Sequence, residues 1–327
     1  MKKTILIISL FSLCFGISKA QQVPQFSQNM FNKLANNPGS AGSSDAINAT
    51  VLHRSQWMGF EGAPKTFNLA LDAPFEVLHG GLGLNIVSDD IGEYSNLGLQ
   101  FSYAFRTDLG QGQLGIGASA GMYQSGLNGG GLIPADLGDV SVPTGEISGS
   151  AVDFGGGIYY NTQDVYLGLS TLHITEPSIE KDDGDIINLS RHYFLLAGYY
   201  QEINPLLSLN PSIYLKSDGS TSQLDVNANL LYNNRIWGGV SYRLDEGIVL
   251  LTGMNINNDL RFGLAYDVVL NQIQNNSLEF MLGYSFKVDY DKPVKSYKNP
   301  RDEDGPGEGV YVKFRYVDRQ PMNLESI

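Results

Sequence analysis

Large apolar side chains occupy every second position over long stretches of this chain. In one stretch they alternate with small or polar residues, and the apolar set is Leu97, Leu99, Phe101, Tyr103 and Phe105. The same period of two recurs over residues 114–122, 224–232 and 278–286. Successive side chains of a β-strand point to opposite faces of its sheet, so each stretch predicts a strand with one apolar face and one small or polar face.

The alternating segments continue from residue 46 to residue 288. We place fourteen strands, at residues 46–53, 66–73, 80–88, 95–105, 113–124, 151–161, 164–170, 191–201, 206–217, 222–232, 235–242, 247–255, 259–267 and 276–288. Many of them have the length of about 9–11 residues that a tilted strand needs to cross an outer membrane. Only alternate residues of such a strand face lipid, so the mean hydropathy of −0.13 is compatible with a membrane barrel.

The connections between these strands are asymmetric. With the mature N-terminus placed in the periplasm, the connections on that side are mostly short, whereas those on the other side include 54–65, 125–150 and 171–190. Short periplasmic turns and longer outer loops are typical of bacterial outer-membrane barrels. We therefore predict an all-β fold, an antiparallel transmembrane β-barrel. A large secreted β-sandwich or jelly roll is the alternative, and the regular strand lengths and inner-face glycines favour the barrel.

The two ends of the chain differ from the alternating region. Residues 1–20 combine Lys2 and Lys3, an apolar stretch too short to span a bilayer, and small residues at Ser18 and Ala20. This pattern predicts a secretory signal peptide that is cleaved after Ala20 and takes Cys14, the single cysteine, with it. We divide the rest into an N-terminal segment, 21–45, with a turn or short helix, the barrel, 46–290, and a periplasmic tail, 291–327.

The composition argues against several functional classes. The formal net charge is −13, with 21 Lys and Arg against 34 Asp and Glu, whereas nucleic-acid binding needs basic surfaces. The four histidines are scattered, and the glycines at 110, 112 and 115 precede a strand instead of a helix. The acidic stretches 182–185 and 302–305 lack a full calcium-loop pattern. We expect no catalytic residues, no metal, no cofactor and no enzymatic activity.

Three short blocks carry a more specific pattern. They read QFSQNMFNKLANNPGSAG at residues 25–42, RSQWMGFEGAPKT at 54–66 and GLGLNIVSDDIG at 81–92. Their order and spacing resemble the PorP/SprF family of Bacteroidetes outer-membrane proteins, which is associated with type IX secretion and gliding. The later strands fit that family only in pattern. The sequence departs mildly from it at Gly39 and His53, and more strongly in the tail beyond Tyr290, because family members tend to end soon after the last strand.

The resemblance implies a non-enzymatic outer-membrane barrel of the type IX secretion system. Such a barrel would assist the export or surface retention of a partner protein, an adhesin-like protein with a C-terminal domain, by binding it and by contacting the periplasmic ring. The implied partners are outer-membrane lipid, that secreted protein and the ring components, with no nucleic acid. The alternative is an outer-membrane pore or transporter for a small or hydrophobic solute, which should have a gated lumen with a plug and a small-molecule site.

The first block holds one set of candidate site residues. Its apolar side chains recur at helical spacing, which predicts a short amphipathic turn that plugs the periplasmic mouth or lies inside the barrel. A purely structural extension is the other interpretation. The Asn-Asn-Pro-Gly stretch predicts a tight turn. The candidate partner-binding or structural residues are Gln25, Phe26, Ser27, Gln28, Met30, Phe31, Asn32, Asn37 and Pro38.

The second block joins the first two predicted strands. Trp and Arg are the residues most enriched in binding hot spots, so we expect this loop to form an inward constriction or a partner-binding surface. A self-packed hairpin that stabilises the barrel is the other interpretation. Its candidate residues are Arg54, Gln56, Trp57, Gly59, Phe60, Gly62, Ala63, Pro64 and Thr66.

The C-terminal tail contains a further strand-like stretch. Residues 310–317 have strand character, and they follow an acidic, Gly- and Pro-containing linker at 302–309. An exposed strand can pair with the sheet of another protein. We expect a periplasmic docking segment, with a disordered tail that pairs only occasionally as the other interpretation.

Overall fold

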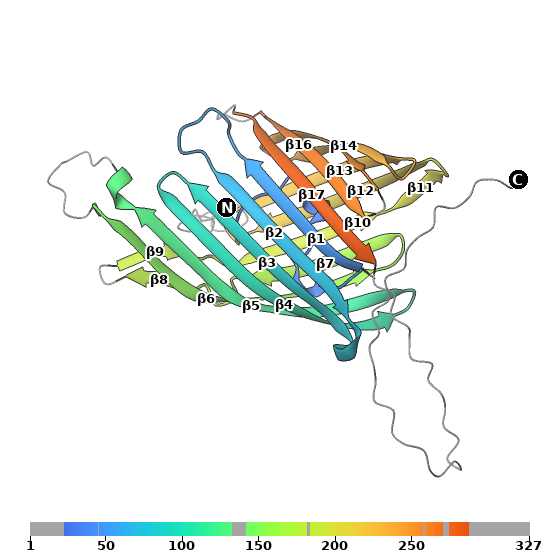
Figure 1. The fold of residues 1–327 in the computed structure, drawn as a ribbon, viewed down its shortest axis with the longest axis horizontal. Helices are drawn as coiled ribbons and strands as arrows, with labels where there is room; N and C mark the ends of the chain where they lie inside the picture. The colour runs from blue at the N-terminus through green and yellow to red at the C-terminus, as the bar shows by residue number, and fades with distance from the viewer. Residues whose placement is uncertain are drawn as a thin grey trace, which may run out of the picture.

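The alternating segments pair with their neighbours in chain order and close on themselves (Figure 1). The structure is a computed structural model that describes residues 23–44, 46–132, 142–181, 184–257, 259–270 and 275–287. Its strands are β1 (Ala46–Ser55), β2 (Lys65–Phe75), β3 (Gly80–Ile91), β4 (Tyr94–Leu109), β5 (Gly112–Asn128), β6 (Glu146–Asn161), β7 (Val165–Leu172), β8 (Ser178–Lys181), β9 (Gly184–Asn188), β10 (His192–Tyr199), β11 (Gln201–Asn204), β12 (Leu207–Ser217), β13 (Ser222–Tyr232), β14 (Ile236–Arg243), β15 (Gly247–Asn255), β16 (Leu260–Val269) and β17 (Ser277–Lys287). Four short 3-10 turns accompany them, η1 (Asn29–Phe31), η2 (Pro38–Ser40), η3 (Glu76–Leu78) and η4 (Gly129–Gly131).

The barrel closes because β1 pairs with β17 and β10 pairs with β12, in both cases antiparallel. Strands β10 and β11 both lie on β12 and are separated only by Tyr200, so together they form one wall strand. Fourteen strands therefore make the wall, which confirms the predicted fold and strand count. Closure leaves the wall without an unpaired edge in lipid, where an unpaired backbone group costs several kcal/mol. Among the described residues, no helix is long and apolar enough to cross a membrane.

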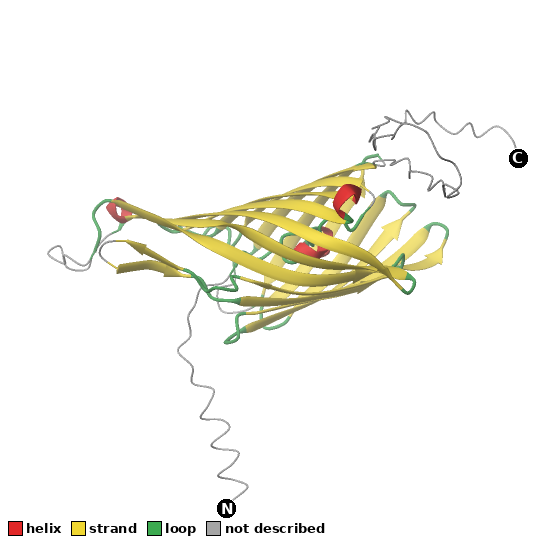
Figure 2. Ribbon diagram, turned by 90° about the horizontal axis from the view of Figure 1, so that it is seen from below, coloured by secondary structure: helices red, strands yellow, loops and turns green. Residues whose placement is uncertain are grey.

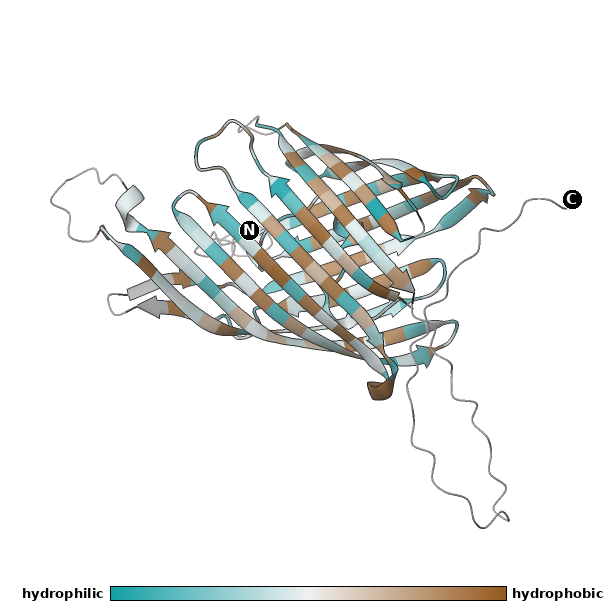
Figure 3. Ribbon diagram, viewed as in Figure 1, coloured by the Kyte–Doolittle hydropathy of each residue, from teal (hydrophilic) through white to brown (hydrophobic). Residues whose placement is uncertain are grey.

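Hydrophobic and hydrophilic residues alternate along the strands of the wall (Figure 3). Large apolar side chains such as Phe101, Leu230 and Phe280 point outward and are exposed. Small or polar side chains such as Ser119 and Asn229 point inward and are buried. An apolar outer face is what contact with lipid requires, and the mostly polar inner face, which also carries apolar side chains such as Leu52 and Met281, forms a lumen.

The two ends of the barrel differ as the sequence predicts. One end, which we call the long-loop end, carries the connections 56–64, 129–145 and 173–191. The other, the short-turn end, carries turns such as 110–111, 162–164 and 233–235. At the long-loop end β5 and β6 run further than predicted, and a separate hairpin, β8–β9, was not predicted at all. Residues 146–150 are rich in Ser and Gly, so the apolar alternation that indicated the other strands is absent there.

Residues 23–44 lie inside the barrel, between its two walls of strands (Figure 2). Of the two predicted placements, the position inside the barrel is the observed one. The predicted amphipathic turn reduces to the three residues of η1, because the chain must follow the lumen wall. The strand expected at 310–317 and the rest of the tail beyond Lys287 lie outside the described residues.

The two ends can be assigned to the two sides of the membrane by labelling. Without Cys14 the chain has no cysteine, so single cysteines can be introduced at exposed positions. We expect Glu61→Cys, at the long-loop end, to react with a membrane-impermeant maleimide in intact cells. Asp164→Cys, at the short-turn end, should react only after the outer membrane is permeabilised. Labelling of Asp164→Cys in intact cells would reverse the orientation.

Candidate functional site

The segment 23–44, which we call the plug, runs through the lumen from one end to the other. At the long-loop end the Val23 N–H donates to His192 Nε2 at 3.4 Å, and Lys216 Nζ donates to the Val23 carbonyl at 3.3 Å. Near the short-turn end the Gly42 N–H donates to Asp72 Oδ2 at 3.1 Å. The described part of the plug therefore begins at the long-loop end, whereas the mature N-terminus was predicted to lie on the side of the short turns.

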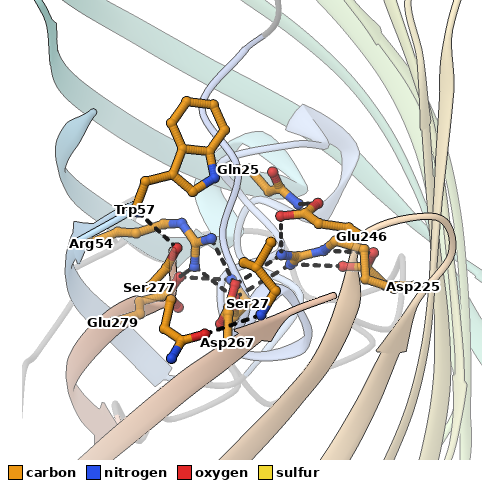
Figure 4. A network of polar contacts seen from close by, with 12 residues as sticks. Gln25, Ser27, Arg54, Trp57, Asp225, Glu246, Asp267, Ser277 and Glu279 are labelled. Carbon is orange, nitrogen blue, oxygen red and sulfur yellow. Dashed lines mark hydrogen bonds and ion pairs between the residues drawn. The ribbon is translucent and has the colours of Figure 1, made fainter. Parts of the chain in front are cut away.

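Five charged side chains of the wall lie buried around Ser27 of the plug (Figure 4). They come from five strands: Arg54 (β1), Asp225 (β13), Arg243 (β14), Asp267 (β16) and Glu279 (β17). The side chain of each is no more than 4% exposed. We call this group the charge network.

The two guanidinium groups of the network share one carboxylate. Arg54 Nη2 lies 2.7 Å and Arg243 Nη1 lies 2.9 Å from Asp267 Oδ2. The other pairs are Arg54 with Glu279, at 3.4 Å, and Arg243 with Asp225, at 3.1 Å. Each charge is thus paired with an opposite charge, as burial away from water requires.

The plug completes this network with uncharged donors. The backbone N–H groups of Ser27 and Gln28 donate to the two carboxylate oxygens of Glu279, at 2.7 and 2.9 Å. The Ser27 hydroxyl donates to Asp267 at 2.8 Å and accepts from Arg54 Nη1 at 2.8 Å. Three acids face two bases in the network, and these donors stabilise the excess negative charge. The plug is therefore held in place by hydrogen bonds to charged groups.

Around the charge network the plug also packs apolar side chains against the wall. Phe26 joins a buried cluster that includes Leu52, Trp237 and Met281. Phe31 packs against Trp237, with 4.8 Å between ring centroids and a 48° angle between the rings. These contacts bury aromatic surface, which fixes the plug in addition to the polar contacts.

Further along the chain the plug touches the opposite part of the wall. Asn37 Nδ2 donates to the Ile158 carbonyl at 3.0 Å, and its Oδ1 accepts from the Gly39 N–H at 2.8 Å. A Cβ on Gly117 would lie 2.4 Å from the Pro38 carbonyl carbon. The wall therefore needs glycine at position 117, because the backbone of the plug lies directly on it.

The loop of the second block lies at the long-loop rim. Trp57 has a φ of +48°, and its backbone N–H donates to Ser277 Oγ at 3.1 Å. Gly59 and Gly62 also have positive φ, which glycine adopts without strain. Phe60 is 61% exposed, so this loop presents an apolar side chain at its surface.

The structure divides the predicted site residues into two groups. The plug residues lie in the lumen with Arg54, and Thr66 also points inward, where its hydroxyl contacts Asp89. The second group forms the rim loop and comprises Gln56, Trp57, Gly59, Phe60, Gly62, Ala63 and Pro64. Four members of the charge network were not predicted from the sequence: Asp225, Arg243, Asp267 and Glu279. Each is a charged residue at an inward-facing position of a membrane-spanning strand. Such residues are rare in membrane strands, and this could have marked them as candidate site residues.

The plug does not fill the lumen completely. Two cavities of about 500 and 350 Å³ lie on the short-turn side, and both are lined by Met30, Phe31 and Lys33. A cavity of about 300 Å³ lies near the long-loop end, beside Tyr94 and Leu189. A fourth, of about 70 Å³, lies between the plug and Tyr123. Within the described residues, no group of three or more His, Cys, Asp and Glu could hold a metal ion.

Comparisons with known proteins agree with this architecture. The family model described as type IX secretion system membrane protein PorP/SprF matches residues 18–286. A comparison with curated proteins finds no match. The fold is similar to that of the CymD monoaromatic hydrocarbon channel, with a TM-score of 0.50 and 13% identity over 83% of this chain and 95% of that chain. The Ralstonia pickettii toluene transporter TbuX has a TM-score of 0.44 and 14% identity over 79% and 93% of the two chains.

Breaking the charge network should destabilise the protein. Arg54→Met leaves Asp267 and Glu279 with less compensation, and loss of one partner of a buried ion pair costs about 3–5 kcal/mol. We expect a lower urea midpoint of unfolding and faster tryptic cleavage after Lys33. His53→Met, at an outward-facing neighbour, is the control and should change neither. Adding Glu279→Gln to Arg54→Met should recover part of the loss, and no recovery would contradict the assigned pairing.

Crowding the contact between plug and wall should displace the plug alone. In Gly117→Ala the new methyl group would overlap the backbone at Pro38, and we expect a cysteine at Ser40 to react faster with a maleimide. Gly98→Ala is the matched control, because its Cβ would lie 3.5 Å from the nearest atom, an ordinary contact. Both Gly117→Ala and Gly98→Ala should keep the heat-dependent shift in electrophoretic mobility that indicates a folded barrel. Equal labelling rates in the two variants would argue against a tight contact at Gly117.

Proposed function

Because the chain belongs to the PorP/SprF family of type IX secretion system membrane proteins, we propose that it is a non-enzymatic outer-membrane barrel that assists the export or surface retention of a partner protein by binding it. The partner is a secreted surface protein, adhesin-like in having a C-terminal domain that the barrel recognises. The periplasmic ring of the secretion system is the second partner, and it meets the short-turn end.

The single observation that carries this proposal is the way the plug is held. Ser27 and Gln28 contact charges from separate strands of the wall, and the charges they contact are buried. Moving the plug would leave those charges without part of their compensation, which is strongly unfavourable. A lumen obstructed in this way favours a role in binding at the two ends of the barrel over a role in free diffusion through it.

The two ends offer different chemistry for two partners. The long-loop end exposes Met58 and Phe60 on a loop braced by Trp57, a suitable anchor for a folded protein domain. The short-turn end opens into the two cavities that flank Lys33, the larger of which is mostly polar. In the proposed mechanism the exported protein binds at the first end and the ring components at the second, and the plug separates them.

A second candidate function is transport of a small or hydrophobic solute. It is favoured by the presence of a plug with cavities on both sides and by the similar fold of a monoaromatic hydrocarbon channel. The most apolar cavity, beside Phe26 and Met122, has a volume of about 70 Å³. An apolar cavity that holds benzene measures about 150 Å³, so an aromatic hydrocarbon could enter the 300 Å³ cavity at the long-loop end but would need movement of the plug to pass the 70 Å³ cavity.

Deletion of the gene distinguishes the two functions. We expect the deletion strain to lose at least one large protein from its surface, and a plasmid copy of the gene to restore it. The measurement is a comparison of the surface and culture-medium proteomes with those of the parent strain. Loss of one protein indicates a dedicated partner, and loss of many indicates a component that serves the whole secretion system. Unchanged proteomes together with reduced uptake of a monoaromatic hydrocarbon would replace this proposal with the transport function.

A further inference from the structure

The upper part of β6 is paired on one edge only. Strand β5 pairs with β6 along its whole length, from Gln113↔Asn161 to Asn128↔Glu146. Strand β7 pairs with β6 only from Gly156 to Asn161. The rest of β6 continues past β7 toward the long-loop end (Figure 1). Within the described residues no strand pairs with β6 on that edge between Glu146 and Gly155, although the β8–β9 hairpin lies close to β6.

The orientation of the backbone on this edge follows from one hydrogen bond. The Ile174 N–H donates to the Phe154 carbonyl at 3.0 Å, so Phe154 directs its backbone groups toward the β7 side. Backbone groups of successive strand residues alternate between the two edges, and the register between β5 and β6 has no shift. Val152, Ser150 and Ser148 therefore present their N–H and C=O groups to the open edge.

The outward side chains place this edge at the membrane surface. Along the outer face of β6 the apolar residues Phe154 and Val152 are followed by Ser150, Ser148 and Glu146. The neighbouring β5 changes in the same way, from Met122 to Gln124. Unpaired backbone groups are tolerated in water and not in lipid. The open edge above Val152 thus lies where a segment from the aqueous side can reach it, and a free edge is a template for another strand.

A second copy of this chain fits the edge poorly. Two barrels inserted in the same sense are related by an axis along the membrane normal. Barrel strands are tilted by about 35–45°, so the two β6 strands would cross instead of lying side by side. The residues Ser148, Gly149, Ser150 and Ala151 are small and allow a flexible single strand to approach closely. These features favour an extended segment of another protein.

The charges beside the edge indicate the composition of that segment. Glu146 lies at its upper end, and Glu93 reaches the same place, since its carboxylate accepts from Asn128 Nδ2 at 2.8 Å and Asn128 pairs with Glu146. Glu176 lies just beyond Ile174 at the lower end and is exposed. Arg191 lies beside Glu176 and donates to the Ile174 carbonyl at 2.6 Å, so the negative charge is concentrated at the upper end. Glu93 and Glu146 there favour a segment that carries basic residues.

We propose that the open edge of β6, from Ser148 to Val152, receives an extended, basic segment of the exported surface protein as an added β-strand. This inference rests on the proposed function, because it names the surface by which the barrel holds its partner. Main-chain hydrogen bonds supply the affinity in this mode of recognition, and Glu93 and Glu146 at the upper end supply the preference for basic residues.

A proline at the edge tests the proposal. The Ser150 N–H points away from β5, so Ser150→Pro removes a donor of the open edge without removing a bond of the β5–β6 ladder. We expect about tenfold less of the surface protein that is lost in the deletion strain, because a carbonyl of the added strand is left without its donor. Ser150→Ala is the matched control and should behave as the parent. If Ser150→Pro lowers the amount of folded barrel, Ser148→Pro replaces it.

Cross-linking identifies the occupant directly. A photo-reactive amino acid at Ser150 should form an adduct with a basic, extended segment of that same surface protein. The same amino acid at Ser220, an exposed serine at the long-loop end on another part of the rim, is the control. An adduct with a second copy of the barrel would overturn the choice of occupant.

The failure of this inference and that of the proposed function are distinguishable. Normal surface protein in Ser150→Pro, with no adduct at Ser150, would overturn the edge inference while the deletion phenotype still supports the function. A deletion strain that loses no surface protein would overturn both.

Discussion

The requirement that every backbone group in lipid be hydrogen-bonded determines this structure. Fourteen antiparallel strands meet it by closing β1 on β17, and the alternation of outward apolar and inward polar side chains follows from that closure. Closure also creates a polar lumen that the protein has to fill or leave to water. The plug occupies part of that lumen, and it forms hydrogen bonds with the wall that surrounds it.

The charge network makes the plug part of the wall. Arg54, Asp267 and Glu279 come from three strands near the seam where the barrel closes, and Ser27 and Gln28 contact all three. Charged groups in a membrane protein are expensive unless paired, so their burial here requires the plug to be in place. The plug therefore stabilises the seam, and the seam holds the plug. This mutual dependence explains why the first and second sequence blocks, though separated in the chain, meet at Arg54.

The fold could be predicted from the sequence because one pattern, a period of two, repeats in every wall strand. The strand extensions at residues 125–128 and 146–150 were missed because Ser and Gly carry no apolar signal, and the β8–β9 hairpin because it lies within a long loop. In the site, the plug residues and Arg54 were identified through the family blocks. Their acidic partners were missed, since pairing Asp267 or Glu279 with Arg54 depends on the closure of the barrel, which brings together residues more than 200 positions apart.

The open edge of β6 can be understood by the same constraint. Unpaired backbone groups are excluded from lipid, and the pairing of β6 on the β7 side ends at Phe154, close to the point where the outward side chains change from Val152 to Ser150. A strand that crosses the membrane has no reason to continue beyond it, yet β5 and β6 remain paired up to Asn128 and Glu146. The extension adds nothing to the closure of the barrel. The extension places two paired strands, one with a free edge, above the lipid. Strand addition by a partner protein requires this arrangement.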